Sequence, residues 1–218
     1  MGKCFTLFTF LLQALLCSSQ VAVSKEPRHR NVFENNVVRV LDVHVPPKDT
    51  SQFHKHETPS VFIVLNPAKT GSEVITEEIK ATALSKDATI SFEGFYTTPR
   101  IHRVWNEDTT DFHVMDIEML NKKPHSIGAP IQQKGFKFLF DEKPVRVYRL
   151  MLEQGRSIHI QRPTPFLFIG LTDALESISV NKKSFSKKGD FLFIPGRQKI
   201  EVINTKPQPF SFAVLEFK

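Results

Sequence analysis

The segment Thr58-Pro59-Ser60-Val61-Phe62-Ile63-Val64-Leu65 recurs 106 residues later as Thr164-Pro165-Phe166-Leu167-Phe168-Ile169-Gly170-Leu171. Three other matches surround it in the same order: Val38-Arg39-Val40 with Val145-Arg146-Val147, Asn106 with Asn204, and residues 112–118 with residues 210–216. A repeat of this kind indicates that one structural unit occurs twice. The chain therefore carries two copies of one unit, and the first copy has the longer middle loop.

Both copies consist of short strand-like segments separated by turn residues. Residues 37–45 and 60–65 are rich in β-branched and aromatic residues, and they end at Pro46-Pro47 and Asn66-Pro67. Such residues favour strands, whereas proline and asparagine end them. Residues 88–92 and 112–117 repeat the pattern. Many short strands with regular turns predict an all-β sandwich or barrel.

The repeat also divides the chain into domains. We place the first domain at residues 31–121 and the second at residues 138–218. Residues 122–137 contain two prolines and two glycines, which is typical of a linker. A chain of 218 residues is long enough for two domains that each bury a core.

Composition excludes several classes of protein. With 40% hydrophobic and 24% charged residues, the chain is neither collagen-like, nor a coiled coil, nor wholly disordered. Its 20 phenylalanines favour a substantial apolar core. The net charge of +6 is a mild excess on a mixed surface. We interpret the basic clusters Arg28-His29-Arg30, Lys182-Lys183 and Lys187-Lys188 as solvated turns, and we expect no nucleic-acid partner.

Residues 1–24 resemble a secretory signal peptide. Lys3 precedes an apolar run over residues 5–17, and small residues follow, so that cleavage after Ser19 or Ser24 would fit. The apolar run is too short for a stable membrane span, which needs about 20 residues. We therefore predict a secreted or periplasmic protein. Two alternatives are a retained N-terminal anchor and a lipid anchor at Cys17; leucines just before Cys17 disfavour the second.

Both cysteines, Cys4 and Cys17, lie in this segment. The mature chain would then contain no disulfide and no thiol ligand or nucleophile.

Three histidines form the strongest candidate for a site. His54 and His56 alternate along an extended segment, so they share one face. Two imidazoles on one face can hold one metal ion through neutral nitrogen lone pairs. His102 follows 46 residues after His56, in the segment that ends at Asn106.

The His-x-His pair after a proline-rich turn, followed by a distant His-x-x-x-Asn, resembles the two motifs of the cupin superfamily. The resemblance implies two tandem cupin-like double-stranded β-helix (jelly-roll) barrels, with a metal ion inside the barrel bound by His54, His56 and His102. Ser60 or Val61 occupies the position where the family has a glutamate ligand. A three-histidine site of this kind also occurs in thiol-dioxygenase members of the superfamily.

The second copy resembles the second cupin motif from Gly189 to Asn204 but lacks its ligands. Ile200 occupies the histidine position, and counting from Gly155 places Gln161 and Pro163 at the His-x-His positions. We therefore predict one ion per chain, in the first domain. His159, Gln161 and Lys199 are alternatives for a metal-free pocket in the second domain, but we favour a barrel that is filled by side chains.

Further carboxylates and histidines are candidates for additional ligands. Glu57, Glu93 and Glu118 are close in sequence to the histidines. For His44 and His113, which lie in predicted strands, we favour a surface or core role.

The resemblance implies a divalent metal, with Fe(II) favoured over Mn, Ni, Cu or Zn, and a small-molecule substrate. Three neutral ligands leave the ion its full charge and open positions for water or substrate. If the protein is an enzyme, we favour an Fe(II) dioxygenase. The alternatives are a non-catalytic binding protein for a carbohydrate or small acid, and a structural bicupin without an active site, because one fold hosts many functions.

Overall fold

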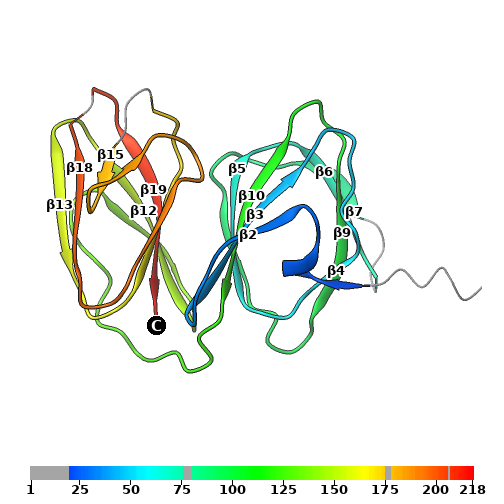
Figure 1. Cartoon of the computed structure of the whole chain (residues 1–218), viewed down its shortest axis with the longest axis horizontal. Helices are drawn as coiled ribbons and strands as arrows, with labels where there is room; N and C mark the ends of the chain where they lie inside the picture. The colour runs from blue at the N-terminus through cyan, green and yellow to red at the C-terminus, as the bar shows by residue number, and fades with distance from the viewer. Residues whose placement is uncertain (1–19, 76–79, 175–177, 206) are drawn as a thin grey trace, which may run out of the picture.

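Two β-barrels lie side by side along the long axis of the molecule, one from each half of the chain (Figure 1). The computed structural model describes residues 20–75, 80–174, 178–205 and 207–218 and, for residues 80–84, the backbone alone. Across these ranges the chain is all β apart from one turn of 3-10 helix, η1 (Val23–Lys25). Nothing helical in these ranges is long and apolar enough to cross a membrane.

The first barrel closes from two five-stranded sheets. One sheet has the order β1 (Val21–Ala22), β4 (His54–His56), β9 (Arg100–Asn106), β6 (Lys69–Val74) and β7 (Lys80–Leu84). The other has the order β2 (His29–Glu34), β3 (Val38–Val45), β10 (Phe112–Met119), β5 (Ser60–Asn66) and β8 (Ile90–Glu93). The strands predicted over residues 37–45, 60–65, 88–92 and 112–117 correspond to β3, β5, β8 and β10.

The second barrel repeats the strand order of each sheet, except that its four-stranded sheet has no counterpart of β1 among the described residues. Its first sheet is β11 (Phe136–Asp141), β12 (Val145–Leu152), β19 (Phe210–Phe217), β14 (Phe166–Gly170) and β17 (Phe191–Ile194). Its second sheet is β13 (Arg156–Gln161), β18 (Lys199–Asn204), β15 (Ile178–Val180) and β16 (Lys183–Phe185). The paired orders confirm the all-β fold class of two tandem jelly-roll barrels.

The repeated asparagines do the same structural work in both barrels. The side-chain amide of Asn106 donates hydrogen bonds to the carbonyl oxygens of Val45 and Thr110, at 2.8 and 2.7 Å. Asn204 donates to Leu152 and Gln208 in the same way, at 2.8 and 2.9 Å. The repeated asparagine thus ties the end of a strand to a neighbouring strand and to a turn.

The two barrels have different interiors. The second is filled by aromatic side chains that are at most 1% exposed, including Phe166, Phe168, Phe185, Phe210 and Phe212. The buried cluster inside the first barrel is smaller and consists of Val23, Leu41, Val43, Val45 and Val114. The interior of the first barrel therefore has room for polar groups.

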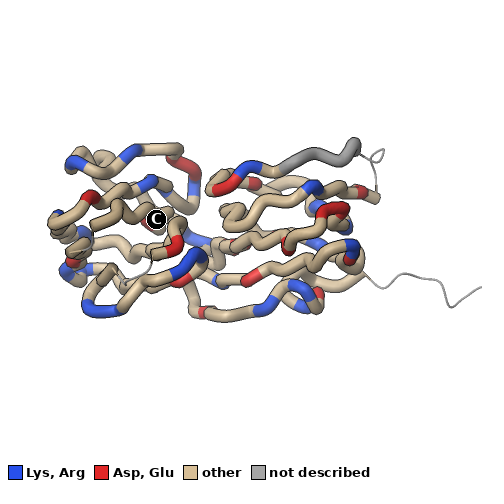
Figure 2. The backbone as a smooth tube through the Cα atoms, turned by 90° about the horizontal axis from the view of Figure 1, so that it is seen from above, with Lys and Arg blue, Asp and Glu red and all other residues tan. Residues whose placement is uncertain are grey.

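A third apolar cluster joins the barrels to each other. It combines Val40, Ile63 and Ile117 of the first barrel with Val147 and Leu215 of the second, and none of these is exposed. These residues alternate along their strands with the inward-facing ones, so each of these two sheets buries both faces. Basic and acidic residues are interspersed over both barrels, as Figure 2 shows, which fits the mild net charge.

The N-terminal segment contributes to the first barrel from residue 20 onward. Residues 1–19, which hold most of the expected signal peptide and both cysteines, lie outside the described residues. Val21 pairs with His54 between β1 and β4, and Val23 is 2% exposed in the core. Cleavage after Ser24 would remove both of these residues from the first barrel.

Candidate metal centre

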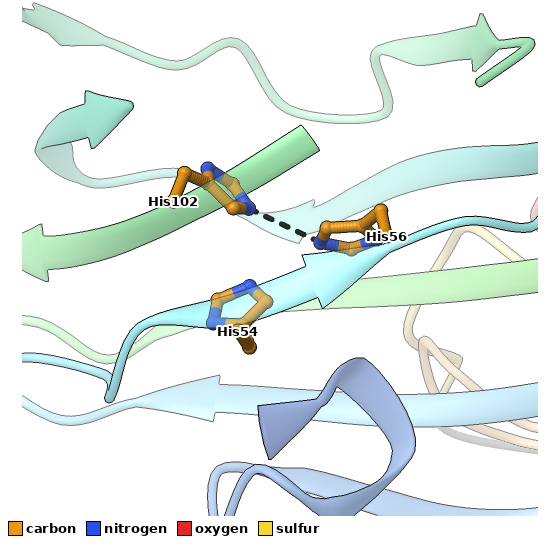
Figure 3. Close-up of side chains that lie close together, drawn as sticks. All are labelled: His54, His56 and His102. Atoms are coloured by element: carbon orange, nitrogen blue, oxygen red, sulfur yellow. Dashed lines mark hydrogen bonds between the residues drawn. The ribbon is translucent and has the colours of Figure 1, made fainter. Parts of the chain in front are cut away.

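The barrel brings His54, His56 and His102 together, as Figure 3 shows. His54 and His56 alternate on β4, so both point inward, where they are only 1% and 3% exposed. His102 lies on the neighbouring strand β9, directly opposite His54 in the antiparallel register. Strand pairing thus closes the gap of 46 residues between His56 and His102.

The spacing of the rings suits one shared ion. Nε2 of His56 lies 3.1 Å from Nε2 of His102. The ring centroid of His54 lies 4.6 Å from that of His102 and 5.1 Å from that of His56. Adjacent imidazoles that each bind a first-row ion at about 2.0–2.2 Å have nitrogens about 3 Å apart. The His56–His102 pair already has this separation.

Hydrogen bonding sets the tautomer of His54. Its Nδ1 lies 2.9 Å from the carbonyl oxygen of Gln52. A carbonyl oxygen only accepts, so Nδ1 carries the proton and donates it. The lone pair is then on Nε2 when the ring is neutral, and this arrangement is typical of a metal-binding histidine.

Burial keeps all three imidazoles neutral. Burial is the main reason that the pKa of each ring is lowered. The pKa is about 4 for His54 and about 2 for His102. The pKa of His56 is lowered further, by burial and by the neighbouring His102 and His54. Nε2 of His56 and Nε2 of His102 share a hydrogen bond, so one of them carries a proton that would move to Nδ1 when a metal ion binds. The three neutral imidazoles then offer the nitrogen lone pairs that such an ion needs.

Asp116 is a site residue that the sequence analysis missed. It lies on β10, is 1% exposed, and has a carboxylate oxygen 3.6 Å from Nδ1 of His56. Nδ1 of His56 has no hydrogen-bond partner among the described residues, and the Asp116 carboxyl has weak hydrogen-bond support, from Ser60. Burial, with a smaller effect of Glu118, raises its pKa well above the usual value. The internal repeat could have revealed Asp116, because the equivalent residue of the second copy is the apolar Val214.

The three glutamates considered as ligands have other positions. Glu118 is buried but forms an ion pair with Arg39 at 2.7 Å. Glu57 is paired with Lys55 at 2.6 Å on the surface. Only Glu93 borders the histidine cavity. No carboxylate among the described residues joins His54, His56 and His102 in the group of ligand atoms that lie within 4.8 Å of one another.

His29 is a second site residue that the sequence analysis did not recognise. It was expected to lie in a solvated turn. It is 8% exposed, and its ring centroid lies 4.6 Å from that of His54. Nδ1 of His29 donates to the buried carboxylate of Glu26 at 2.7 Å. Glu26 also accepts from the backbone amides of Arg28 and Gln52, at 2.6 and 3.1 Å. This network fixes His29 at the edge of the site.

A cavity of about 260 Å³ opens onto the three histidines. Its apolar wall includes Phe62, Val64 and Phe112, whereas Arg100 and Glu93 supply charged groups. A chamber of this size accommodates a small organic molecule beside an ion.

Among its described residues, the second barrel has no equivalent site. Ile160 lies opposite Ile200, just as His54 lies opposite His102, so the positions of these two histidines hold buried isoleucines. This register corrects the expectation that Gln161 and Pro163 take the His-x-His positions. His159 points outward, with 70% of its side chain exposed. With Gln161 and Lys199 it borders a hollow that also contacts Ile160 and Ile200.

Solved structures share this fold. YhhW from Escherichia coli has a TM-score of 0.62 at 11% identity, over 86% of this chain and 84% of its own. Salicylate 1,2-dioxygenase from Pseudaminobacter salicylatoxidans has 0.60 at 10%, over 86% and 73%; a variant of it was solved in complex with gentisate. A cupin 2 conserved barrel domain protein from Leptotrichia buccalis has 0.55 at 12%, over 86% and 87%.

One of these neighbours is a cupin barrel protein, so the comparison supports the cupin resemblance at the level of fold. No protein-family model matches the sequence, and no curated protein matches it.

Proposed function

We propose that this chain is an exported metalloprotein in which His54, His56 and His102 bind one divalent ion, with Fe(II) preferred, and that the first barrel acts on a small organic acid as an oxygenase. One observation carries the proposal: three neutral imidazoles converge on a cavity in the first barrel, whereas isoleucines and phenylalanines fill the equivalent space in the second.

The ligand set determines what the centre can do. Three neutral histidines leave a divalent ion with its charge and with positions open to the cavity. When bound, the ion would supply Lewis-acid chemistry and, in the case of iron, one-electron exchange with dioxygen.

The chain itself supplies orientation and exclusion of water. Asp116 lies behind His56 and is placed to orient its ring. Burial raises the pKa of Asp116 above its usual value, so its neutral form is more favoured than that of an exposed aspartate. Phe62 and Phe112 form a dry wall beside the histidines, which strengthens every electrostatic interaction in the site.

The cavity favours a small acid over a carbohydrate. Arg100 offers a cation at a wall that is otherwise largely apolar, and an aromatic carboxylate would match both features. Salicylate, in the name of one structural neighbour, and gentisate, bound in a structure of its variant, belong to this chemical class.

Metal content and oxygen uptake test this proposal together. Protein loaded anaerobically with Fe(II) should contain one ion in the barrel and consume dioxygen with at least one member of a panel of hydroxybenzoates. His102→Ala should lose both the barrel ion and oxygen uptake. His159→Ala is the matched control, since its side chain is exposed on the other barrel, and it should keep both.

Two results would overturn the proposal or part of it. Full occupancy of the barrel in His102→Ala would remove the three-histidine site. A stoichiometric ion without oxygen uptake on any acid, but with ligand-induced thermal stabilisation, would replace the oxygenase by a non-catalytic binding protein.

A further inference from the structure

A second group of metal-binding side chains lies outside the barrel, on the face of the first domain that is turned toward the second. His44 on β3 and His113 on β10 lie directly opposite each other in the antiparallel register. Their rings stack with centroids 4.0 Å apart and planes inclined by 20°. Asp42 precedes His44 by two residues and so shares its face.

Both rings direct the same nitrogen at one carboxylate oxygen. Oδ1 of Asp42 lies 2.6 Å from Nε2 of His113 and 3.4 Å from Nε2 of His44. The other oxygen of Asp42 accepts from Arg30 at 2.5 Å. Ligand atoms that share a first-row ion lie about 3 Å apart, so these separations bracket the required value.

Asp111 orients His44 for binding. Nδ1 of His44 lies 2.6 Å from a carboxylate oxygen of Asp111, which can only accept, so Nδ1 carries the proton. In a neutral ring the lone pair then lies on Nε2, which faces the anionic Asp42. An imidazole held by a carboxylate on one nitrogen, with the other nitrogen free, is the usual arrangement of a metal-binding histidine.

The second barrel shows that the fold does not need this cluster. Met151 and Ser211 lie opposite each other in its register, just as His44 and His113 do in the first. Two aligned histidines beside an aspartate are therefore specific to the first domain.

The cluster opens onto a cavity of about 560 Å³ between the two barrels. Lys183, Lys187 and Gly189 of the second barrel line its opposite wall. A Cβ atom on Gly189 would lie 3.4 Å from Cε1 of His113, so this loop approaches the cluster closely where it has no side chain. An ion bound by the cluster would have positions open toward this cavity.

We propose that Asp42, His44 and His113 bind a second divalent transition-metal ion at this interdomain cavity, through Oδ1 of the aspartate and Nε2 of both histidines. Two imidazoles and one carboxylate suit zinc, copper, nickel or iron. The proton on Nε2 of His113 would move to Nδ1 or be released. The site would raise the expected content from one ion per chain to two, both in the first domain.

Zinc titration calorimetry of the full chain tests the proposal without relying on the barrel site. In a His54→Ala/His102→Ala background, which disables the barrel site, one Zn²⁺ should still bind. Adding His44→Met or His113→Ser should abolish this binding, and Asp111→Asn should weaken it by about 10–100-fold. His44→Met and His113→Ser copy the residues that the second barrel carries at the same positions, so folding should be retained. Circular dichroism would verify it. His159→Ala should have no effect.

The outcomes separate this site from the barrel site. If the barrel binds no metal, wild-type protein binds one Zn²⁺ and His44→Met alone removes it. If the background variant binds no Zn²⁺, or binds it equally well after His44→Met, the interdomain site does not exist.

Discussion

A buried carboxyl with little hydrogen-bond support is costly, and Asp116, which has only weak support from Ser60 among the described residues, is such a group. Its position is occupied by a valine in the second barrel, so the fold does not require the acid. We infer that Asp116 is kept for the metal centre, where it lies behind His56. Stability and metal affinity should therefore respond in opposite directions when it is replaced.

Asp116→Val tests this trade-off. Metal-free protein should become more stable by about 1–3 kcal/mol, because a buried carboxyl with weak hydrogen-bond support is removed. Affinity of the barrel for its ion should fall by about 10–100-fold, because His56 loses its orienting carboxyl. Urea unfolding and metal titration measure the two effects. A variant that is less stable and binds metal normally would show that Asp116 is structural.

Glu26 gives the first domain a dependence on acid pH. Burial alone would raise its pKa, but hydrogen bonds from His29 and from the amides of Gln52 and Arg28 outweigh it and lower the pKa from 4.5 to about 2. The folded state thus binds fewer protons than the unfolded state in this window. The stabilisation is complete above pH 4.5 and is lost as the pH falls toward 2.

Glu26→Gln should remove this contribution. At pH 7 the variant should be less stable than wild type by on the order of 2–3 kcal/mol, and the gap should narrow as the pH falls from 4.5 to 2. Denaturant unfolding at several pH values measures the difference. A gap that stays constant over this range would contradict the role given to Glu26.

At the scale of the strands, the repeated asparagines link the end of one strand to another strand and to a turn. Asn106 ends β9 and bonds carbonyl oxygens of β3 and of the following turn. Asn204 ends β18 with the same two bonds. The asparagine of the second motif is therefore a structural residue in both barrels, whether or not a metal site is present.

Asn106→Ala and Asn204→Ala should each lower the free energy of unfolding by about 1–3 kcal/mol, because buried carbonyl groups lose their donors. Thermal or urea unfolding of the two variants compares them. Metal binding at the barrel should survive Asn106→Ala, because its side chain donates only to backbone. Loss of metal from a folded Asn106→Ala protein would give this residue a role in the site.

The arrangement of the two barrels explains why one of them can host a cavity. The second barrel is packed with phenylalanines. A further apolar cluster lies between the two barrels, where each barrel covers the apolar outer face of the other. Because these clusters supply much of the buried apolar surface, the interior of the first barrel can hold histidines and space. Hydrophobic burial is the main favourable contribution to folding.

Together with the proposed export, the same packing favours a mature chain that begins at Gln20. We expect N-terminal sequencing of protein from its native host to begin at Gln20, since Val21 extends the sheet at β4 and Val23 is buried. A start at Lys25 would require the first barrel to form without η1. An intact Met1 would contradict export.

Much of this architecture follows from local patterns. Alternation places His54 and His56 on one face, prolines end the strands, and the repeat reveals two domains, because each property depends on residues that are close in sequence or on the comparison of two copies. Asp116 and His29 escaped detection for a different reason. Each joins the site from another strand, and neither lies in a motif.

Proximity across strands and across barrels depends on register, closure and packing. The register of β9 against β4 sets His102 opposite His54, and that of β10 against β3 sets His113 opposite His44. A shift of one residue would turn each side chain to the other face of its sheet. The sequence supplied the ligand types and the strand faces. Closure of the barrel and the docking of its neighbour determined which of them meet, because contacts between distant segments form only when the whole sheet is paired and its apolar faces are buried.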